Sequence, residues 1–197
     1  MILQAFWQST NKYMKEISLH IMDIVQNSIT ADATAIAVRV TVDRENDRLA
    51  VEVEDNGRGM DSAYLARVTS PFVTARSTRK VGLGIPLFKA GCERCEGSFS
   101  IQSEPGRGTT VRATYQLSHL DRPPMGDLAG TLHTIAQCNP DLNFEFEACS
   151  GGKTFVCSTA EIKEKLGGVS IATPEVSTWL IEYLSEGIEE IFGGSFE

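Results

Sequence analysis

The residues best suited to chemistry lie in the stretch DNGRGM, residues 55 to 60, which follows an alternating apolar run. It combines a carboxylate at a strand end, Asp55, with Gly57 and Gly59, which allow a positive φ or the close approach of a ligand. A buried carboxylate accepts a hydrogen bond from the exocyclic amine of a flat base, and Met60 would lie against the ring. We therefore interpret Asp55 as the residue that reads a base. The alternative is an ordinary turn in which Asp55 caps the next helix.

Two further patterns suit a ligand that carries phosphates. Gly82, Leu83 and Gly84 precede a helix start, where backbone amides attract anions. Asp23 and Asn27 lie four residues apart, so a helix would point both side chains at a single site. A carboxylate at this place can orient or deprotonate an attacking group, and an amide oxygen is a hard ligand for magnesium. Each pattern also has an ordinary explanation, as a tight connection before a helix or as a solvated helix face.

The periodicity of the chain indicates the elements that must position these residues. A helical period over residues 16–33 places two sets on separate stripes: an apolar one of Ile17, Ile21, Ile24, Val25 and Ser28, and a polar one of Glu16, His20, Asp23 and Asn27. Alternation predicts strands at 35–43, 48–55, 98–104 and 109–117. A second helix begins near Pro86 and stops at Gly97. This order of helix, strands, helix and hairpin predicts an α/β sandwich.

Two segments stand apart from this pattern. Residues 61–81 are polar with little apolar periodicity, which is typical of a mobile lid. The prolines and turn residues of 118–127 indicate a boundary near residue 120. Beyond it, the sequence predicts a helix at 126–138, a hairpin at 143–159 that turns at Gly151 and Gly152, and helices at 160–166 and 174–191. We interpret this part as a small α+β unit.

Composition limits the classes of partner. The net charge of −8 argues against nonspecific binding to nucleic acid or to an acidic membrane, both of which need a basic face. No apolar run approaches the roughly 18 residues of a membrane span, and the start lacks the features of a signal peptide. The five cysteines are an odd, scattered set, which indicates free thiols and a cytoplasmic location. Cys92 and Cys95 form one CxxC, either a redox pair or half a metal site, but ordinary partly buried cysteines are the simpler interpretation.

Four motifs, DIVQNS, DNGRGM, GLGIPLF and SEPGRGTTV, follow one another between residues 23 and 111. This set resembles the ATP-binding fold shared by gyrase, the ninety-kilodalton heat-shock chaperone, histidine kinases and MutL, the GHKL superfamily. The resemblance covers about residues 15 to 117, and its end is most similar to histidine-kinase catalytic domains. It implies an α+β fold, a two-layer sandwich of a mixed sheet covered by helices on one face, with ATP bound between the layers under a lid.

The resemblance also implies a role for each matching residue. Asp55 would bind the adenine amino group, Asn27 would coordinate Mg²⁺ on the triphosphate, and Asp23 stands where family ATPases place a general base. The remaining positions surround the nucleotide: Gly57, Gly59 and Met60 at the base pocket, Thr109 in the adenine-side hydrogen bonds, Gly82, Leu83 and Gly84 beside the phosphates, and Arg76, Arg79 and Lys80 as positive charges in or next to the lid. The basic residues have an alternative interpretation as solvated lid residues.

These inferences divide the chain into an N-terminal extension at 1–14, an ATP-binding domain at 15–118 and a partner-binding or regulatory unit at 119–197. Few residues precede the first helix, and no helical hairpin with a phosphoacceptor histidine is present there, so we expect a stand-alone protein that phosphorylates a protein partner in trans. His20 is then a structural histidine. Histidine kinases usually have asparagine where Asp23 stands and hydrolysing relatives have glutamate, so two alternatives stay open: an ATP-gated partner-binding module, or a slow ATPase.

Overall fold

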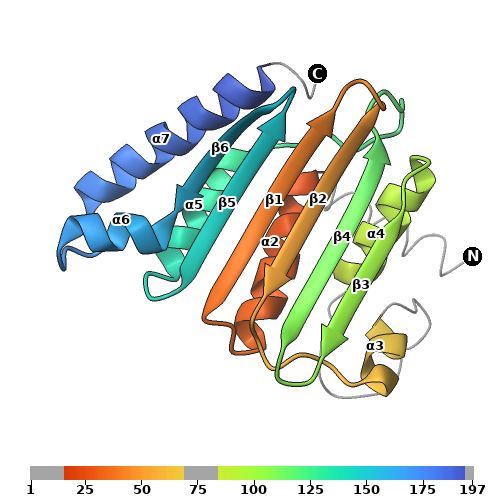
Figure 1. Cartoon of the computed structure of the whole chain (residues 1–197), viewed down its shortest axis with the longest axis horizontal. Coiled ribbons are helices and arrows are strands. Elements are labelled where there is room, and N and C mark those ends of the chain that lie inside the picture. The colour runs from red at the N-terminus through yellow and green to blue at the C-terminus, as the bar shows by residue number, and fades with distance from the viewer. Residues whose placement is uncertain (1–15, 69–83, 194–197) are drawn as a thin grey trace, which may run out of the picture.

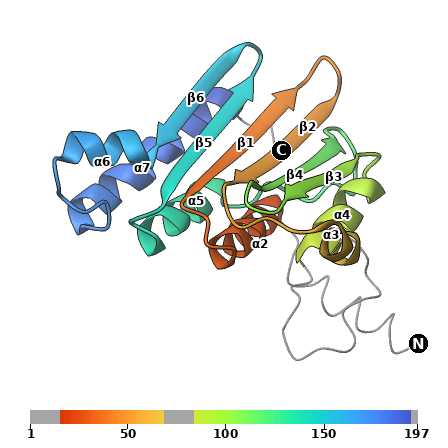
Figure 2. The ribbon, with the colours of Figure 1, turned by 60° about the horizontal axis from the view of Figure 1, so that its bottom comes forward.

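The structure, a computed structural model, describes residues 16–68 and 84–193. In this part of the chain six strands form one mixed sheet in the order β3-β4-β2-β1-β5-β6. Helices pack on one face of the sheet and leave the other face open (Figure 1, Figure 2). The predicted α+β sandwich, with a mixed sheet covered on one face, is confirmed.

The centre of the sheet is the antiparallel pair β1 (Ala35–Asp43) and β2 (Arg48–Asp55), at the bounds expected from the sequence. Every second residue of β1 is buried, and cross-strand pairs such as Val38 with Val53 and Val40 with Val51 lie in the core. Such β-branched pairs suit a pleated, half-buried surface. On the other side of β2, the antiparallel pair β4 (Gly108–Gln116) and β3 (Phe99–Glu104) completes the half of the sheet next to the candidate site.

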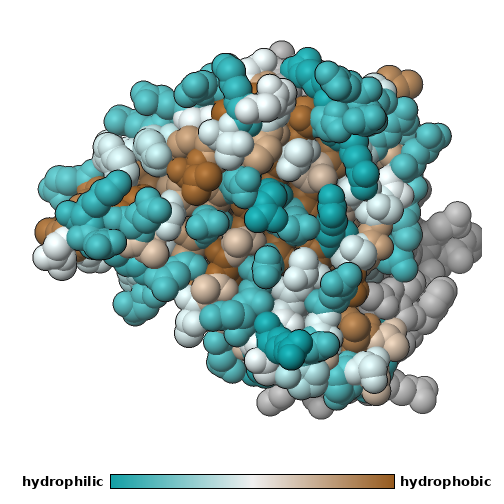
Figure 3. All heavy atoms as spheres, viewed as in Figure 1, coloured by the Kyte–Doolittle hydropathy of each residue, from teal (hydrophilic) through white to brown (hydrophobic). Residues whose placement is uncertain are grey.

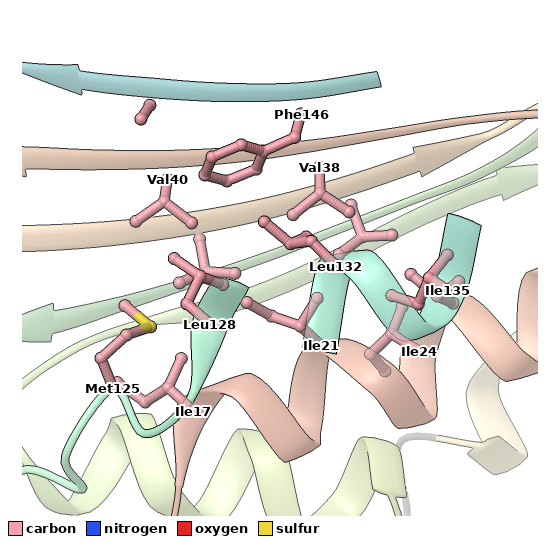
Figure 4. Packing of buried hydrophobic residues seen from close by; sticks show 14 of the residues in the cluster. Ile17, Ile21, Ile24, Val38, Val40, Met125, Leu128, Leu132, Ile135 and Phe146 are labelled. Atoms are coloured by element: carbon pink, nitrogen blue, oxygen red, sulfur yellow. The ribbon is translucent and has the colours of Figure 1, made fainter. Parts of the chain in front are cut away.

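Helix α2 (Ile17–Thr30) covers this centre with its apolar stripe. Ile17, Ile21 and Ile24 lie against β1 together with residues of α5 (Leu128–Cys138), as Figure 4 shows. Helix α4 (Gly84–Arg94) packs beside α2 and over β4. The core therefore lies between one helical layer and one sheet, and it fixes the position of the polar residues on α2.

The C-terminal part of the chain continues the same sheet. Strand β5 (Asn143–Ser150) pairs in parallel with β1, and β6 (Lys153–Ser158) pairs antiparallel with β5 through a turn at Gly151 and Gly152. Helix α6 (Thr159–Leu166) follows β6, and α7 (Pro174–Phe192) packs against β5, β6 and α5. The hydrophobic core runs without interruption from α2 to α7. The part expected to be a separate unit thus shares one sheet and one core with the rest.

One segment differs from its expected conformation. Residues of the anticipated lid form a short helix, α3 (Ser62–Val68). The Asp61 side chain accepts a hydrogen bond from the backbone N–H of Tyr64 at 2.7 Å, which is the N-cap geometry that starts a helix. The rest of the anticipated lid lies outside the described residues.

The open face of the sheet is polar. Figure 3 views this face and shows hydrophilic side chains over much of it. Arg39 of β1 forms ion pairs with Glu52 on one neighbouring strand and Glu147 on the other. In the described ranges, no helix combines the length and the apolar character that crossing a membrane requires.

Candidate functional site

A cavity of about 780 Å³ lies where the C-terminal half of α2 meets the end of β2 and the start of β4. Its third side is the stretch from Arg58 to Val68, which includes α3. Figure 1 shows α3 next to the end of β3, at the edge of the sheet where β2 ends and β4 starts. Polar groups line the cavity together with the apolar side chains of Ile24, Met60, Val68, Ile85 and Val111. A cavity of this size and mixed lining is typical of a small-molecule site.

Asp55 is the buried acid of this cavity. It ends β2, it is 9% exposed, and it lies opposite Thr109 of β4. Its Oδ1 accepts a hydrogen bond from the Gly57 N–H at 2.9 Å, and its Oδ2 accepts one from the Ser28 hydroxyl at 2.6 Å. A carboxylate has about four acceptor positions, so acceptor capacity remains for a ligand that donates.

The Ser28 contact was missed at the sequence level, because Ser28 fell on the apolar stripe of the helix. The structure buries it there, with its hydroxyl also 3.2 Å from the carbonyl oxygen of Ile24. A serine in the middle of a buried helical stripe needs a polar partner, and this need was the available signal. Ser28 therefore holds the Asp55 carboxylate from the helix side.

The two glycines of DNGRGM are required by close backbone packing. A Cβ on Gly57 would lie 2.8 Å from the carbonyl oxygen of Ala31 and 3.0 Å from Oδ1 of Asp55. Gly59 has a φ of +65°, and a Cβ there would overlap the carbonyl oxygen of Glu104. Gly59 lines the cavity and Gly57 does not. Both glycines were expected at the base pocket; Gly59 lies in the cavity wall, and Gly57 contacts the Asp55 carboxylate through its N–H.

Met60 and Thr109 meet at Ser103 of β3. The Ser103 hydroxyl accepts a hydrogen bond from the Met60 N–H at 2.8 Å, donates to the Gly108 carbonyl at 2.9 Å, and lies 2.9 Å from the Thr109 hydroxyl. Met60 and Thr109 both line the cavity. This network joins the DNGRGM turn to the β3–β4 hairpin, so the wall that carries Met60 is tied to the sheet.

Asn27 and Asp23 occupy different surroundings. Asn27 is exposed and lines the cavity next to Ser28. Asp23, one turn earlier, is half-buried, and it is not among the described residues that line the cavity. It lies against the first residue of α4, since a Cβ on Gly84 would be 2.8 Å from Oδ2 of Asp23. Burial raises the pKa of Asp23 above its usual value.

Of the expected phosphate-binding residues, Gly84 lies within the ranges that the structure describes. Gly84 is buried at the start of α4, beside Asp23. The other expected members of this group lie outside the described residues: Arg76, Arg79, Lys80, Gly82 and Leu83.

His20 lies on a different face of the helix from the one expected. It was assigned to the polar stripe, but it is 3% exposed and stacks on Phe88 with the ring centroids 5.1 Å apart. Its spacing from Ile17 and Ile24 places it on the buried face of α2. Burial lowers the pKa of His20 to about 4, so the ring is neutral at physiological pH. This environment suits a structural histidine.

The cysteines of the CxxC are both buried in the core. Burial raises the pKa of Cys92 to about 12, which disfavours the thiolate that redox chemistry and metal binding need. Within residues 16–68 and 84–193, no group of three or more His, Cys, Asp or Glu side chains is placed to hold a metal ion.

The region that contains the cavity matches a known protein family. The family model described as "Histidine kinase-, DNA gyrase B-, and HSP90-like ATPase" matches residues 15–119, just over half of the chain. The N-terminal domain of a DNA repair protein, a solved structure, superposes with a TM-score of 0.51 at 16% identity, over 75% of this chain and 54% of that chain. At this identity the likeness concerns the fold alone.

Curated relatives match the chain over about as many residues as the family model does. "Sensor protein kinase FleS" of Pseudomonas aeruginosa is 38% identical over 89 residues, which are 45% of this chain and 22% of the relative. "Non-motile and phage-resistance protein" of Caulobacter vibrioides is 33% identical over 111 residues, 52% of this chain and 13% of the relative. The chain thus spans less than a quarter of the length of either relative.

Proposed function

The chain belongs to the family of histidine kinase-, DNA gyrase B- and HSP90-like ATPases, and we propose that its cavity binds ATP with Mg²⁺ and that it phosphorylates a protein partner in trans. One observation carries the proposal. The buried carboxylate of Asp55 faces a cavity of about 780 Å³ and keeps acceptor positions that no described residue uses. The relative described as a sensor protein kinase supports the phosphotransfer part.

In this proposal Asp55 accepts a hydrogen bond from the adenine amino group. The carboxylate is held by Ser28 and the Gly57 N–H, so its orientation is fixed before the nucleotide arrives. Ile24, Met60 and Val111 supply apolar surface around it, which suits the flat faces of a base. Thr109, opposite Asp55, completes the polar edge.

The phosphates would lie toward the start of α4, because a helix N-terminus attracts anions. The amide oxygen of Asn27 would be one protein ligand of Mg²⁺, with phosphate oxygens and water as the others, a common arrangement for this ion. Four residues outside the described ranges complete the proposed phosphate site, as the resemblance implies: Arg76, Lys80, Gly82 and Leu83.

Asp23 is the proposed proton acceptor. In phosphotransfer, the bond between the terminal phosphorus and the oxygen of the ADP leaving group breaks, and a bond to the side chain of the partner forms. The Asp23 carboxylate takes the proton of that side chain, and its raised pKa moves it toward the range in which general bases work. The partner is an unidentified protein, and the part of the chain after residue 119 is a candidate for recognising it. The cytoplasm, where free cysteines such as Cys92, Cys138 and Cys149 stay reduced, is the proposed location.

A second candidate function is an ATP-gated binding module with slow or no phosphotransfer. It is favoured by the position of Asp23, which lies against Gly84 and does not line the described part of the cavity. A ligand that closes a site can change the affinity for a partner without any chemical step.

The two candidates differ in what happens to the terminal phosphate. The full chain, incubated with γ-labelled ATP and an extract of its own cells, should label a protein if the first candidate is correct. Asp23→Asn should keep ATP affinity and lose the labelling, with Glu45→Gln, an exposed acid of the turn between β1 and β2 that does not line the cavity, as the control. ATP binding with no labelling by the wild type would favour the gated module, and full labelling by Asp23→Asn would remove Asp23 from the mechanism.

A further inference from the structure

We infer that Tyr64 of α3 stacks against the nucleotide base, an inference that rests on the proposed ATP site. Tyr64 is the one aromatic side chain among the described residues that line the cavity. It is 40% exposed, although it belongs to a cavity wall. An aromatic ring offers a flat base the largest contact at low cost in conformational entropy, and it does so for every base.

The backbone under Tyr64 is fixed by the cap of its helix. The Tyr64 N–H donates to Oδ1 of Asp61 at 2.7 Å, and the Leu65 N–H donates to the Asp61 carbonyl at 2.9 Å. These two bonds hold the first turn of α3 on the residue that follows the DNGRGM turn. The position of the Tyr64 backbone relative to the DNGRGM turn is therefore fixed.

The segment that leads to α3 is tied to both other walls of the cavity. The Arg58 N–H donates to the carbonyl of Ala31 at the end of α2, at 2.9 Å. The Arg58 carbonyl accepts from the Gly106 N–H of the β3–β4 turn at 2.8 Å. Together with the Met60 bond to Ser103, these contacts make the wall that carries Tyr64 part of the folded domain.

Arg67 lies over the Tyr64 ring. Its guanidinium carbon lies 5.3 Å from the centroid of the Tyr64 ring, within the range of a cation–π contact. Arg67 does not line the cavity, whereas Tyr64 does. The guanidinium lies over one face of the ring, so the other face is left for a ligand.

Tyr64 and Asp55 then have separate tasks. Stacking on Tyr64 contributes affinity for any base, because every base has a flat face. The carboxylate of Asp55 selects a base whose edge carries an amino group, because it can only accept hydrogen bonds. Loss of Tyr64 should weaken all nucleotides together, and loss of Asp55 should change the preference among them.

Calorimetric titration of the full chain with Mg-ATP and with inorganic triphosphate tests this inference. Tyr64→Ala should bind ATP about 5- to 150-fold more weakly, the range seen when a stacked aromatic residue is truncated. Tyr64→Phe should stay within about twofold of the wild type because it keeps the ring. Neither variant should change the affinity for triphosphate. Trp179→Ala, which removes an exposed aromatic residue of α7, is the control and should bind ATP as the wild type does.

The outcomes separate this inference from the function on which it rests. No ATP binding by the wild type would overturn both. Wild-type ATP affinity in Tyr64→Ala would overturn the stacking role and leave the ATP site intact. A loss in Tyr64→Phe as large as that in Tyr64→Ala would also overturn it, because the hydroxyl would then make the contact. Thermal midpoints without nucleotide show whether each variant folds, and Tyr64→Leu, with an apolar side chain of similar reach, repeats the test if the alanine variant does not.

Discussion

Replacing Asp55 with asparagine removes a negative charge and one acceptor oxygen from the cavity with almost no change in volume. In the free protein most of the local contacts survive. The asparagine oxygen can keep the bond from the Gly57 N–H, which Oδ1 accepts at 2.9 Å in the wild type. The Ser28 hydroxyl can turn toward the Ile24 carbonyl, already 3.2 Å away, and accept from the new amide group.

The size of each effect follows from this count. The free energy of unfolding should fall by only about 1 kcal/mol, since both hydrogen bonds to the side chain are kept and only their charge assistance is lost. ATP binding should lose more, about 1–3 kcal/mol or 5- to 150-fold in Kd, because the adenine amino group loses a charged, buried acceptor. The larger effect on binding than on folding is what distinguishes a ligand-reading acid from a structural cap.

Two titrations and one denaturation curve check this prediction. The variant should lose ATP affinity and keep its affinity for inosine triphosphate, whose base has a carbonyl in place of the amino group. A denaturant melt should show a stability close to that of the wild type. ATP affinity within twofold of the wild type, or a large loss of stability with no change in the preference for ATP, would refute the role given to Asp55.

Three further predictions concern the framework of the site. Burial lowers the pKa of His20 from 6.5 to about 4, so the free energy of unfolding should fall by up to about 3 kcal/mol as the pH drops from 6.5 to 4. Denaturant melts of His20→Phe should lack this part of the pH dependence. Burial raises the pKa of Asp23, so the ionised carboxylate lowers the stability of the folded protein. Asp23→Asn should therefore raise the thermal midpoint at pH 7, and this gain should vanish below the ordinary Asp pKa of 3.8. A gain that does not change with pH would contradict the reasoning. Gly59→Ala should cost at least about 2 kcal/mol, because its Cβ would overlap a backbone oxygen. Gly106→Ala, also at positive φ but facing open space, should cost about half as much, and equal losses in urea melts would exclude the overlap as the cause.

Local patterns predicted the parts of the fold that depend on local physics. The strands at 35–43 and 48–55 have the expected bounds, since strict alternation of β-branched residues leaves little choice of element. The turn at Gly151 and Gly152 is also where the sequence placed it. Asp55 was recognised from its position at a strand end before two glycines, and the structure buries it in the cavity.

Non-local contacts decided what the sequence did not reveal. The parallel pairing of β5 with β1 joins residues about a hundred positions apart, and no short pattern records it. The Ser28 bond to Asp55 and the stacking of His20 on Phe88 depend on how α2 meets its neighbours. Helix α3 was overlooked because seven residues are too few for a clear helical period, although Asp61 was available as an N-cap signal.

The most direct test of the central claim is a calorimetric titration of the chelator-treated full chain with ATP, with and without magnesium. The account predicts saturable binding of ATP that magnesium strengthens, as expected if Asp55 holds the base and Asn27 helps to hold the metal. No binding of ATP under either condition would contradict it, and the cavity between α2 and the sheet would then need another ligand.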